Sequence, residues 1–367
     1  MGIQLTQKIF DHQYNFISVF NPKTGAYVRT GILNQDGHDT GIDPFMASFP
    51  HLIDVGIMGH CIHGKTGLCI KAGIGCYQSG LTIQKPNMSP DDFLLIANQC
   101  SGKVNQFALG GRGDPDQHEH FEEILFICRE NSIVPNFTTS GYGMTEELAW
   151  LSKKYCGAVA VSWYRNEYTD HAIRLFIEAG IKTNIHYVLG NNSIDEAITR
   201  LKNDDFPIGI NAIIFLLHKP VGSGSKNNVL SPKDVRVSEL FAQIDRGKHR
   251  FKVGIDSCSV PGIVNFCKNV IPEAIDPCEG GRFSCYIGAD MVMMPCSFDQ
   301  QKRYEVSLRE HSIEQAWISK PFEEFRKILG SGCAHCAKKT NCMGGCPLLP
   351  EIVLCSDKSN YSEDKEN

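Results

Sequence analysis

The sequence has few features of a nucleic-acid-binding, membrane or secreted protein. Its 367 residues carry a net charge of −5 and contain no basic run that would follow a nucleic-acid backbone, so we expect no direct nucleic-acid partner. No apolar stretch reaches membrane-spanning length. The first residues also lack the basic start and apolar core of a secretory signal. These absences predict a cytoplasmic protein that has no membrane partner.

Cysteine, by contrast, is abundant, with 16 residues in the chain. A cytoplasmic protein keeps its thiols reduced, so clustered cysteines in such a chain indicate metal sites rather than disulfides. Cys100, Cys128, Cys156 and Cys267 stand alone in apolar or helical surroundings, and we interpret them as ordinary buried thiols.

The first cluster lies in a glycine-rich loop, residues 59–80, which follows an apolar run expected to form a buried strand, residues 51–58. The loop contains Cys61, Cys69 and Cys76. Three soft thiolates at a strand end suit a four-iron cluster that has one open iron. A zinc site and unrelated buried thiols remain alternatives, because the spacing Cys-x7-Cys-x6-Cys matches no common pattern.

From residue 51 onward, apolar runs alternate with helical periodicity. We expect strands at 52–58, 104–110, 134–139, 157–163, 182–189, 209–217 and 250–256. We expect helices at 90–100, 117–130, 144–155, 168–179, 192–203 and 232–246. Repeated βα units predict parallel strands with right-handed crossovers, in a barrel or an open doubly wound sheet. Residues 1–50 are expected to contain a hairpin around residues 21–24 and to pack on the barrel.

Polar residues gather where these strands end, which is where α/β proteins carry their chemistry. The groups are Gly110–Pro115, Thr138–Gly141, Ser162–Asn166, His186, His218–Gly224 and Asp256–Cys258. Each group alone is also explained by a turn or by a polar residue that satisfies its neighbours. Their repetition at one end of successive strands favours a functional site.

The segment 257–355 changes character, because it contains many cysteines and little hydrophobic periodicity. Eight of its cysteines are candidate metal ligands: Cys278, Cys285, Cys296, Cys333, Cys336, Cys342, Cys346 and Cys355. Eight thiolates suffice for two four-cysteine clusters, and one or two structural zinc ions explain the spacing equally well. The polar tail, residues 356–367, is expected to be disordered.

Several motifs resemble those of radical S-adenosylmethionine (SAM) enzymes that carry a C-terminal SPASM-type iron–sulfur domain. The stretch 107–115 resembles the family's Gly-Gly-Glu-Pro strand end, and the spacing Cys333-x2-Cys336-x5-Cys342-x3-Cys346 matches the SPASM pattern. The resemblance covers residues 51–355. It implies an α/β fold, a partial (βα) TIM-like barrel at 51–256, a small cysteine-rich auxiliary-cluster domain at 257–355 and an N-terminal extension at 1–50.

The resemblance also implies cofactors and their ligands. Cys61, Cys69 and Cys76 would hold the catalytic [4Fe–4S] cluster, and SAM would bind its open iron. The expected SAM contacts are Gly110, Gly111, Asp114, Thr139, Ser162 and Arg165. One auxiliary cluster would use Cys333, Cys336, Cys342 and Cys355. The other auxiliary cluster would use Cys278, Cys285, Cys296 and Cys346.

Three features depart from the family pattern. The usual cysteine motif is Cys-x3-Cys-x2-Cys, the usual Gly-Gly-Glu glutamate is replaced by Arg112 with Asp114 nearby, and no glycine precedes Pro295-Cys296. The implied reaction begins when a reduced cluster, supplied by a donor such as flavodoxin or ferredoxin, cleaves SAM to methionine and a 5′-deoxyadenosyl radical. That radical then removes hydrogen from an unactivated carbon.

Within this family the chain is most similar to the queuine lyases, through residues 43–46, 59–61, the long cysteine loop and 110–118. This resemblance implies cleavage of the carbon–nitrogen bond of queuine. The product, 7-aminomethyl-7-deazaguanine, would be salvaged for transfer RNA modification. A peptide maturase is an alternative, although residues 1–50 lack the pattern of a winged-helix leader-binding module. An iron–sulfur electron carrier or a zinc binding module is an alternative of another class.

A queuine-like base needs a carboxylate for its guanine edge and polar groups for its diol and amine. Asp256 is the first candidate for the carboxylate, and Asp290 is the second. Asn211, His186 and His218 are candidates for the diol or the amine, and Asp256, His186 and His218 are also the candidate catalytic residues. For each of these residues, pairing with a structural neighbour is an equally good explanation.

Overall fold

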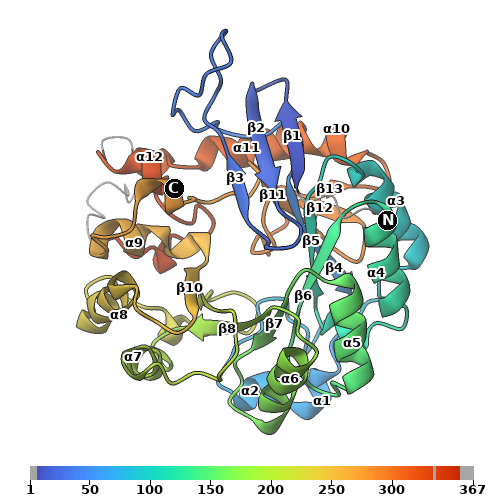
Figure 1. Ribbon diagram of the computed structural model, residues 1–367, viewed down its shortest axis with the longest axis vertical. Helices are drawn as coiled ribbons and strands as arrows, with labels where there is room; N and C mark the ends of the chain where they lie inside the picture. The colour runs from blue at the N-terminus through green and yellow to red at the C-terminus, as the bar shows by residue number, and fades with distance from the viewer. Residues whose placement is uncertain (1–5, 334–335, 356–367) are drawn as a thin grey trace, which may run out of the picture.

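The computed structural model of the chain describes residues 6–333 and 336–355, and its main feature is a ten-stranded sheet (Figure 1). The sheet order is β10-β9-β8-β7-β6-β5-β4-β11-β12-β13. Strands β4 to β10 are parallel, each pairing with its successor along the chain. They are β4 (Leu52–Met58), β5 (Gln106–Gly111), β6 (Val134–Thr139), β7 (Val159–Ser162), β8 (Thr183–Leu189), β9 (Ala212–Leu217) and β10 (Lys252–Ile255). Each expected strand is therefore present.

A long helix precedes each of the strands β5 to β10 and packs on the outside of the curved sheet (Figure 1). These helices are α3 (Pro90–Cys100), α4 (Phe121–Glu130), α5 (Glu146–Tyr155), α6 (Glu167–Glu178), α7 (Ile194–Asn203) and α8 (Val235–Arg246). Side-chain caps define several starts: Ser89 accepts a hydrogen bond from the Asp92 N–H, and Asn166 accepts one from the Thr169 N–H. The expected helices are confirmed.

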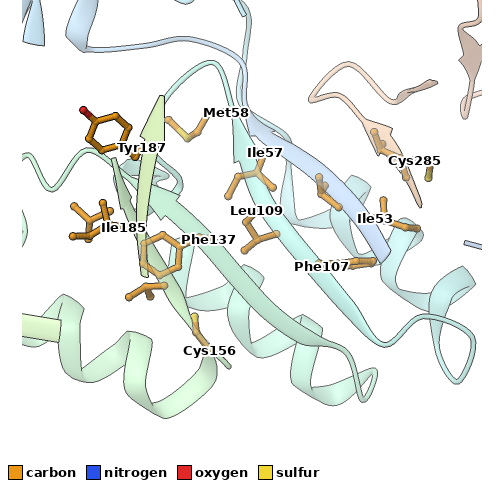
Figure 2. Close-up of a cluster of buried hydrophobic side chains, with 14 of the residues drawn as sticks. Ile53, Ile57, Met58, Phe107, Leu109, Phe137, Cys156, Ile185, Tyr187 and Cys285 are labelled. Carbon is orange, nitrogen blue, oxygen red and sulfur yellow. The ribbon is translucent and has the colours of Figure 1, made fainter. Parts of the chain in front are cut away.

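The hydrophobic core lies between the outer face of the sheet and these helices (Figure 2). Successive residues of a strand point to opposite faces. Ile53, Val55 and Ile57 of β4 are therefore buried in the core, while Asp54 and Gly56 face the interior of the curved sheet. Strand β8 shows the same alternation, with Ile185 and Tyr187 buried and His186 less buried.

The C-terminal segment continues the barrel sheet. Strand β11 (Ser284–Ile287) pairs in parallel with β4, and β12 (Val292–Met294) and β13 (Val306–Ser307) follow in antiparallel pairing. The helices of this segment are α9 (Val260–Phe266), α10 (Ile313–Trp317), α11 (Lys320–Ile328) and α12 (Lys339–Cys342). The 3₁₀ helices are η1 (Pro115–Gln117), η2 (Lys226–Asn228), η3 (Ser257–Ser259), η4 (Pro272–Ala274), η5 (Ser331–Cys333) and η6 (Pro350–Ile352). In the described part of the chain, the strands that follow the expected boundary at residue 257 therefore belong to the barrel sheet and form no sheet of their own.

The N-terminal residues form a separate antiparallel sheet of β1 (Gln7–Asp11), β2 (Phe16–Phe20) and β3 (Tyr27–Arg29), which contains the expected hairpin. This sheet contacts the C-terminal segment as well as the barrel. Arg29 pairs with Asp276 and Glu279, and its guanidinium lies 4.2 Å from the ring centroid of Phe283. The barrel contact includes a hydrogen bond from Lys182 to the Lys23 carbonyl. The expected packing on the barrel is therefore only part of the interface.

No helix in the described part of the chain is long and apolar enough to span a membrane. The tail expected to be disordered, residues 356–367, lies outside the described residues.

Candidate functional site

The loop after β4 brings Cys61, Cys69 and Cys76 together. Two short helices, α1 (His63–Thr66) and α2 (Leu68–Lys71), fold the loop back on itself. The pKa of the Cys61 thiol is raised to about 11, chiefly by burial, and the charges of Asp114, Cys76 and Cys69 contribute to this rise. Burial and the charge of Cys76 likewise raise the pKa of Cys69. These mutual effects show that the three thiols are neighbours, as a shared cluster requires.

The last cysteine of the loop is fixed to the segment that follows β9. The Cys76 N–H donates to the Ser223 hydroxyl at 2.7 Å, and the Ser223 N–H donates to the Cys76 carbonyl at 3.0 Å. Glycine is needed here, because a Cβ on Gly75 would lie 2.6 Å from the Gly224 Cα. The cysteine loop is thereby attached across the C-terminal end of the barrel.

A buried polar network attaches the start of the same loop to β5 and β6. His63 Nε2 lies 2.8 Å from Asp114 Oδ2, and the Ser140 hydroxyl lies 2.5 Å from the same oxygen. His63 is two residues from Cys61, so this network positions the first thiol. Asp114, which was expected to bind the SAM ammonium group, is here paired with His63.

Asp116 is a carboxyl group that the sequence reasoning did not single out. It lies in η1, is 5% exposed, and its Oδ1 has no hydrogen-bond partner in the described part of the chain. Burial raises its pKa to about 7, and the charge of Asp114 adds to the rise. Its position immediately after Gly-Gly-Arg-Gly-Asp-Pro was the available signal. A buried carboxyl with a free oxygen next to the cysteine loop suits a cationic ligand group.

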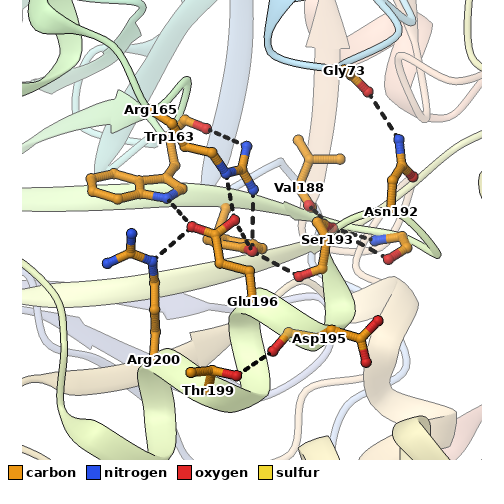
Figure 3. Close-up of polar contacts among 12 residues, drawn as sticks. Gly73, Trp163, Arg165, Val188, Asn192, Ser193, Asp195, Glu196, Thr199 and Arg200 are labelled. Atoms are coloured by element: carbon orange, nitrogen blue, oxygen red, sulfur yellow. Dashed lines mark hydrogen bonds and ion pairs between the residues drawn. The ribbon is translucent and has the colours of Figure 1, made fainter.

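The expected SAM contacts divide into two sets. Gly110, Gly111 and Ser162 lie at the ends of β5 and β7, and a Cβ on Gly110 would meet nothing within 4 Å. Thr139 is fully buried, and its hydroxyl accepts the Gly141 N–H. Arg165 is bound to Glu196, as Figure 3 shows. Thr139 and Arg165 are therefore engaged in internal contacts.

The Glu196 network in Figure 3 is structural. The carboxylate accepts hydrogen bonds from the Trp163 indole at 3.2 Å, from Arg200 at 2.7 Å and from the Tyr187 hydroxyl at 3.0 Å. Together with Arg165, these contacts join the end of β7 to α7. The arginine is therefore occupied in stabilising the barrel.

Tyr164 is a further residue that sequence reasoning did not select. Burial raises the pKa of its hydroxyl, and the charges of Asp114, Cys69 and Cys76 raise it further. Tyr164 therefore lies close to the thiols, next to the strand end at Ser162. Its place in the Ser162–Asn166 group was the only signal in the sequence.

Most expected substrate residues have structural partners. Asp256 forms an ion pair with Lys219 and accepts hydrogen bonds from Ser259 at 2.7 Å and the Leu217 N–H at 3.1 Å. Asp290 pairs with Lys85 at 2.6 Å.

The expected polar partners are similarly occupied. Asn211 donates to Asn184 at 2.7 Å, and His218 Nε2 lies 2.9 Å from the Ser225 carbonyl. His186 lies 3.3 Å from the Thr138 hydroxyl, and burial lowers its pKa to about 4, so it is neutral at pH 7.

One set of C-terminal cysteines surrounds a cavity against α9. The cavity is lined by Cys333, Cys336, Cys342 and Cys355. These are the four cysteines that the family resemblance groups together. Four thiols around one cavity fit a four-iron cluster.

The other set differs from the expectation at one position. The thiols of Cys258 and Cys346 form a hydrogen bond, and burial and the charges of Cys278 and Cys258 raise the pKa of Cys296. Cys258, Cys278, Cys296 and Cys346 therefore lie together.

Cys285 does not join this group. It is 2% exposed in β11, pairs in register with Ile53 and lies near Cys100 in the hydrophobic core (Figure 2). The strand alternation of β11 turns its side chain into that core, whereas Cys258 in η3 lies among the other three thiols.

Among the described residues, no three His, Cys, Asp or Glu side chains converge on a single metal ion. A four-iron cluster needs a wider arrangement, because each thiolate binds a different iron.

No protein-family model matches the sequence, and no curated protein matches it. Solved structures share its fold. Streptococcus suis SuiB bound to S-adenosylmethionine matches with a TM-score of 0.63 and 17% identity, covering 85% of this chain and 78% of SuiB. SuiB bound to its precursor peptide SuiA matches with a TM-score of 0.63 and 17% identity, covering 85% of this chain and 77% of that one.

A third structure, anSMEcpe with bound AdoMet, matches with a TM-score of 0.59 and 16% identity, covering 84% of this chain and 92% of the other. Identities this low establish a shared fold. They confirm the α/β partial barrel expected for the chain.

Proposed function

We propose that this chain is a radical SAM enzyme with two auxiliary iron–sulfur clusters. The observation that carries the proposal is the grouping of Cys61, Cys69 and Cys76 at the C-terminal end of β4, in a fold shared with structures that bind S-adenosylmethionine. When bound, a [4Fe–4S] cluster and SAM supply a 5′-deoxyadenosyl radical that removes hydrogen from the substrate.

The chain's own residues would position these groups. The three thiols must lose their protons to bind iron, and fixing Cys76 to Ser223 keeps the set preorganised. Gly110 leaves space at the end of β5, and Asp116 offers an unpartnered oxygen to the ammonium of SAM. The His63–Asp114 pair orients the loop.

The auxiliary clusters would be held by the segment 257–355. We assign one to the cavity of Cys333, Cys336, Cys342 and Cys355 and the other to Cys258, Cys278, Cys296 and Cys346. Lys219 is buried beside Cys258, and its charge is paired with that of Asp256.

A peptide is the favoured substrate class. SuiB was solved with precursor peptide SuiA and anSMEcpe with AdoMet and the Cp18Cys peptide, and both share this fold. The reaction would then be the modification of a ribosomally made peptide.

Cleavage of queuine is the second candidate. The N-terminal 6–50 segment that the structure describes forms a small antiparallel sheet without a helix, so it offers no winged-helix module for a leader peptide. A small base would need no such module.

The test is anaerobic reconstitution with iron and sulfide, reduction, and incubation with SAM in the presence of queuine or a candidate peptide. We expect 5′-deoxyadenosine together with a mass change in one substrate, and no 5′-deoxyadenosine from Cys76→Ala. A protein that binds zinc and fails to cleave SAM would contradict the proposal.

A further inference from the structure

The interior of the barrel contains a carboxylate with no partner. Asp54 lies in the middle of β4, between β5 and β11. Its side chain makes no hydrogen bond and no ion pair within the described part of the chain, and solvent reaches it. Burial alone raises its pKa to about 6. Both findings are explained if the carboxylate faces a solvent-filled space that protein surrounds.

The strand register shows why this space exists. Asp54 is directly opposite Ala108 of β5, and Gly56 is opposite Gly110 one step nearer the cysteine loop. Side chains of registered residues on parallel strands share a face. Ala108 and Gly110 carry little or no side chain on this face, and a Cβ on Gly110 would meet nothing within 4 Å, whereas the position over Gly56 is taken by the Tyr286 hydroxyl.

Polar groups from two other elements border the same space. Tyr286 of β11 is in register with Asp54, and its hydroxyl lies over Gly56, 2.3 Å from where a Cβ would stand. Tyr77 comes from the cysteine loop; burial raises the pKa of its hydroxyl, and the charge of Asp54 contributes. Gln78 is buried, and its Nε2 has no hydrogen-bond partner among the described residues.

This combination is typical of a ligand site rather than of a structural contact. A carboxylate that protein surrounds, that has a raised pKa and that has no protein partner is a candidate for a functional site. Asp256, the carboxylate expected to bind substrate, is instead neutralised by Lys219. The oxygens of Asp256 already accept hydrogen bonds from Lys219, Ser259 and the Leu217 N–H. Those of Asp54 have no protein donor among the described residues and can accept hydrogen bonds from a ligand.

We propose that Asp54 binds the substrate by accepting hydrogen bonds from an amidine-type edge, in which two N–H groups point the same way. A carboxylate accepts such a pair in a bidentate, charge-assisted arrangement. The Gln78 amide would donate to a neighbouring carbonyl or hydroxyl of the ligand. The inference rests on the proposed function, because it places substrate on the barrel side of the cysteine loop.

Two sources present this chemistry: a guanine-type base and an arginine side chain of a peptide. The first test uses benzamidinium chloride, which carries the edge alone. Its dissociation constant is measured by calorimetry for the reconstituted wild type, for Asp54→Asn and for the control Asp36→Asn, an exposed loop carboxylate. We expect Asp36→Asn to bind as the wild type does and Asp54→Asn to bind about tenfold more weakly or worse.

The same titration is then made with 7-deazaguanine, which represents the base, and with N-acetylarginine amide, which represents the peptide side chain. The ligand that binds more weakly to Asp54→Asn than to the wild type identifies the substrate class. Equal benzamidinium affinity in Asp54→Asn, or no binding by the wild type, would overturn the inference. Iron content and 5′-deoxyadenosine formation in the same preparations report on the proposed function separately. Asparagine removes a buried charge without changing shape, so the variant should melt no lower than the wild type.

Discussion

The assignment of Cys258 in place of Cys285 makes a quantitative prediction about iron content. Three four-iron clusters correspond to about 12 iron atoms per chain. The double variant Cys258→Ala/Cys296→Ala removes half of the thiols from one auxiliary group, so the iron content should fall to about 8. Cys285→Ala leaves all three cysteine groups intact and should retain about 12.

The two changes should differ in how much they lower stability before iron is added. Cys285 is 2% exposed and packs in the core with Ile53, so its truncation should lower the free energy of unfolding by about 1–2 kcal/mol. Cys258 and Cys296 lie among other thiols at the ligand site, where their truncation removes fewer core contacts.

The assay is anaerobic iron and sulfide analysis of reconstituted protein, combined with denaturant unfolding of the iron-free chains. Loss of about four irons from Cys285→Ala, with full retention in the Cys258→Ala/Cys296→Ala variant, would refute the assignment. Retention of about 12 irons in both variants would refute it as well.

Three further predictions follow from other parts of the structure. Burial raises the pKa of Asp116 to about 7, so the folded chain holds a proton that the unfolded chain releases near pH 4. The free energy of unfolding should therefore fall as the pH rises from 4 to 7. Urea unfolding of Asp116→Asn should lack this part of the pH dependence. Trp317→Phe removes the hydrogen bond from the indole N–H to the Ala47 carbonyl at 2.9 Å, and should lower the free energy of unfolding by about 1 kcal/mol or more in the same assay. Since the Asp54 pKa is raised to about 6 and the ionised form binds cations, benzamidinium affinity should increase from pH 5 to pH 7, and a flat profile would contradict this.

Local sequence patterns predicted the barrel elements well. The cap at Ser89 followed by acidic residues marked the start of α3, and the apolar run that forms β9 had no other good explanation. These features depend on neighbours along the chain, so a single sequence contains them. The cysteine spacing at 333–346 similarly indicated one thiol group that the structure brings around a cavity.

The features that were missed depend on contacts between distant segments. Cys258 contacts Cys346, which lies 88 residues further along the chain. Cys285 lies in β11, and the parallel pairing of β11 with β4 places its side chain in the hydrophobic core. Asp54 stands within an apolar run, and only the folded strand shows that it is exposed while its neighbours Ile53 and Val55 are buried. Asp256 looked available because its partner Lys219 comes from another strand end.

The central claim is that Cys61, Cys69 and Cys76 support SAM cleavage, and one measurement tests it most directly. Reconstituted and reduced wild-type protein and the Cys76→Ala variant are incubated with SAM, and 5′-deoxyadenosine and iron are quantified. The account predicts 5′-deoxyadenosine from the wild type only, while the variant keeps the auxiliary iron, about 8 atoms per chain. Equal product from both proteins, or none from a fully iron-loaded wild type, would contradict the account.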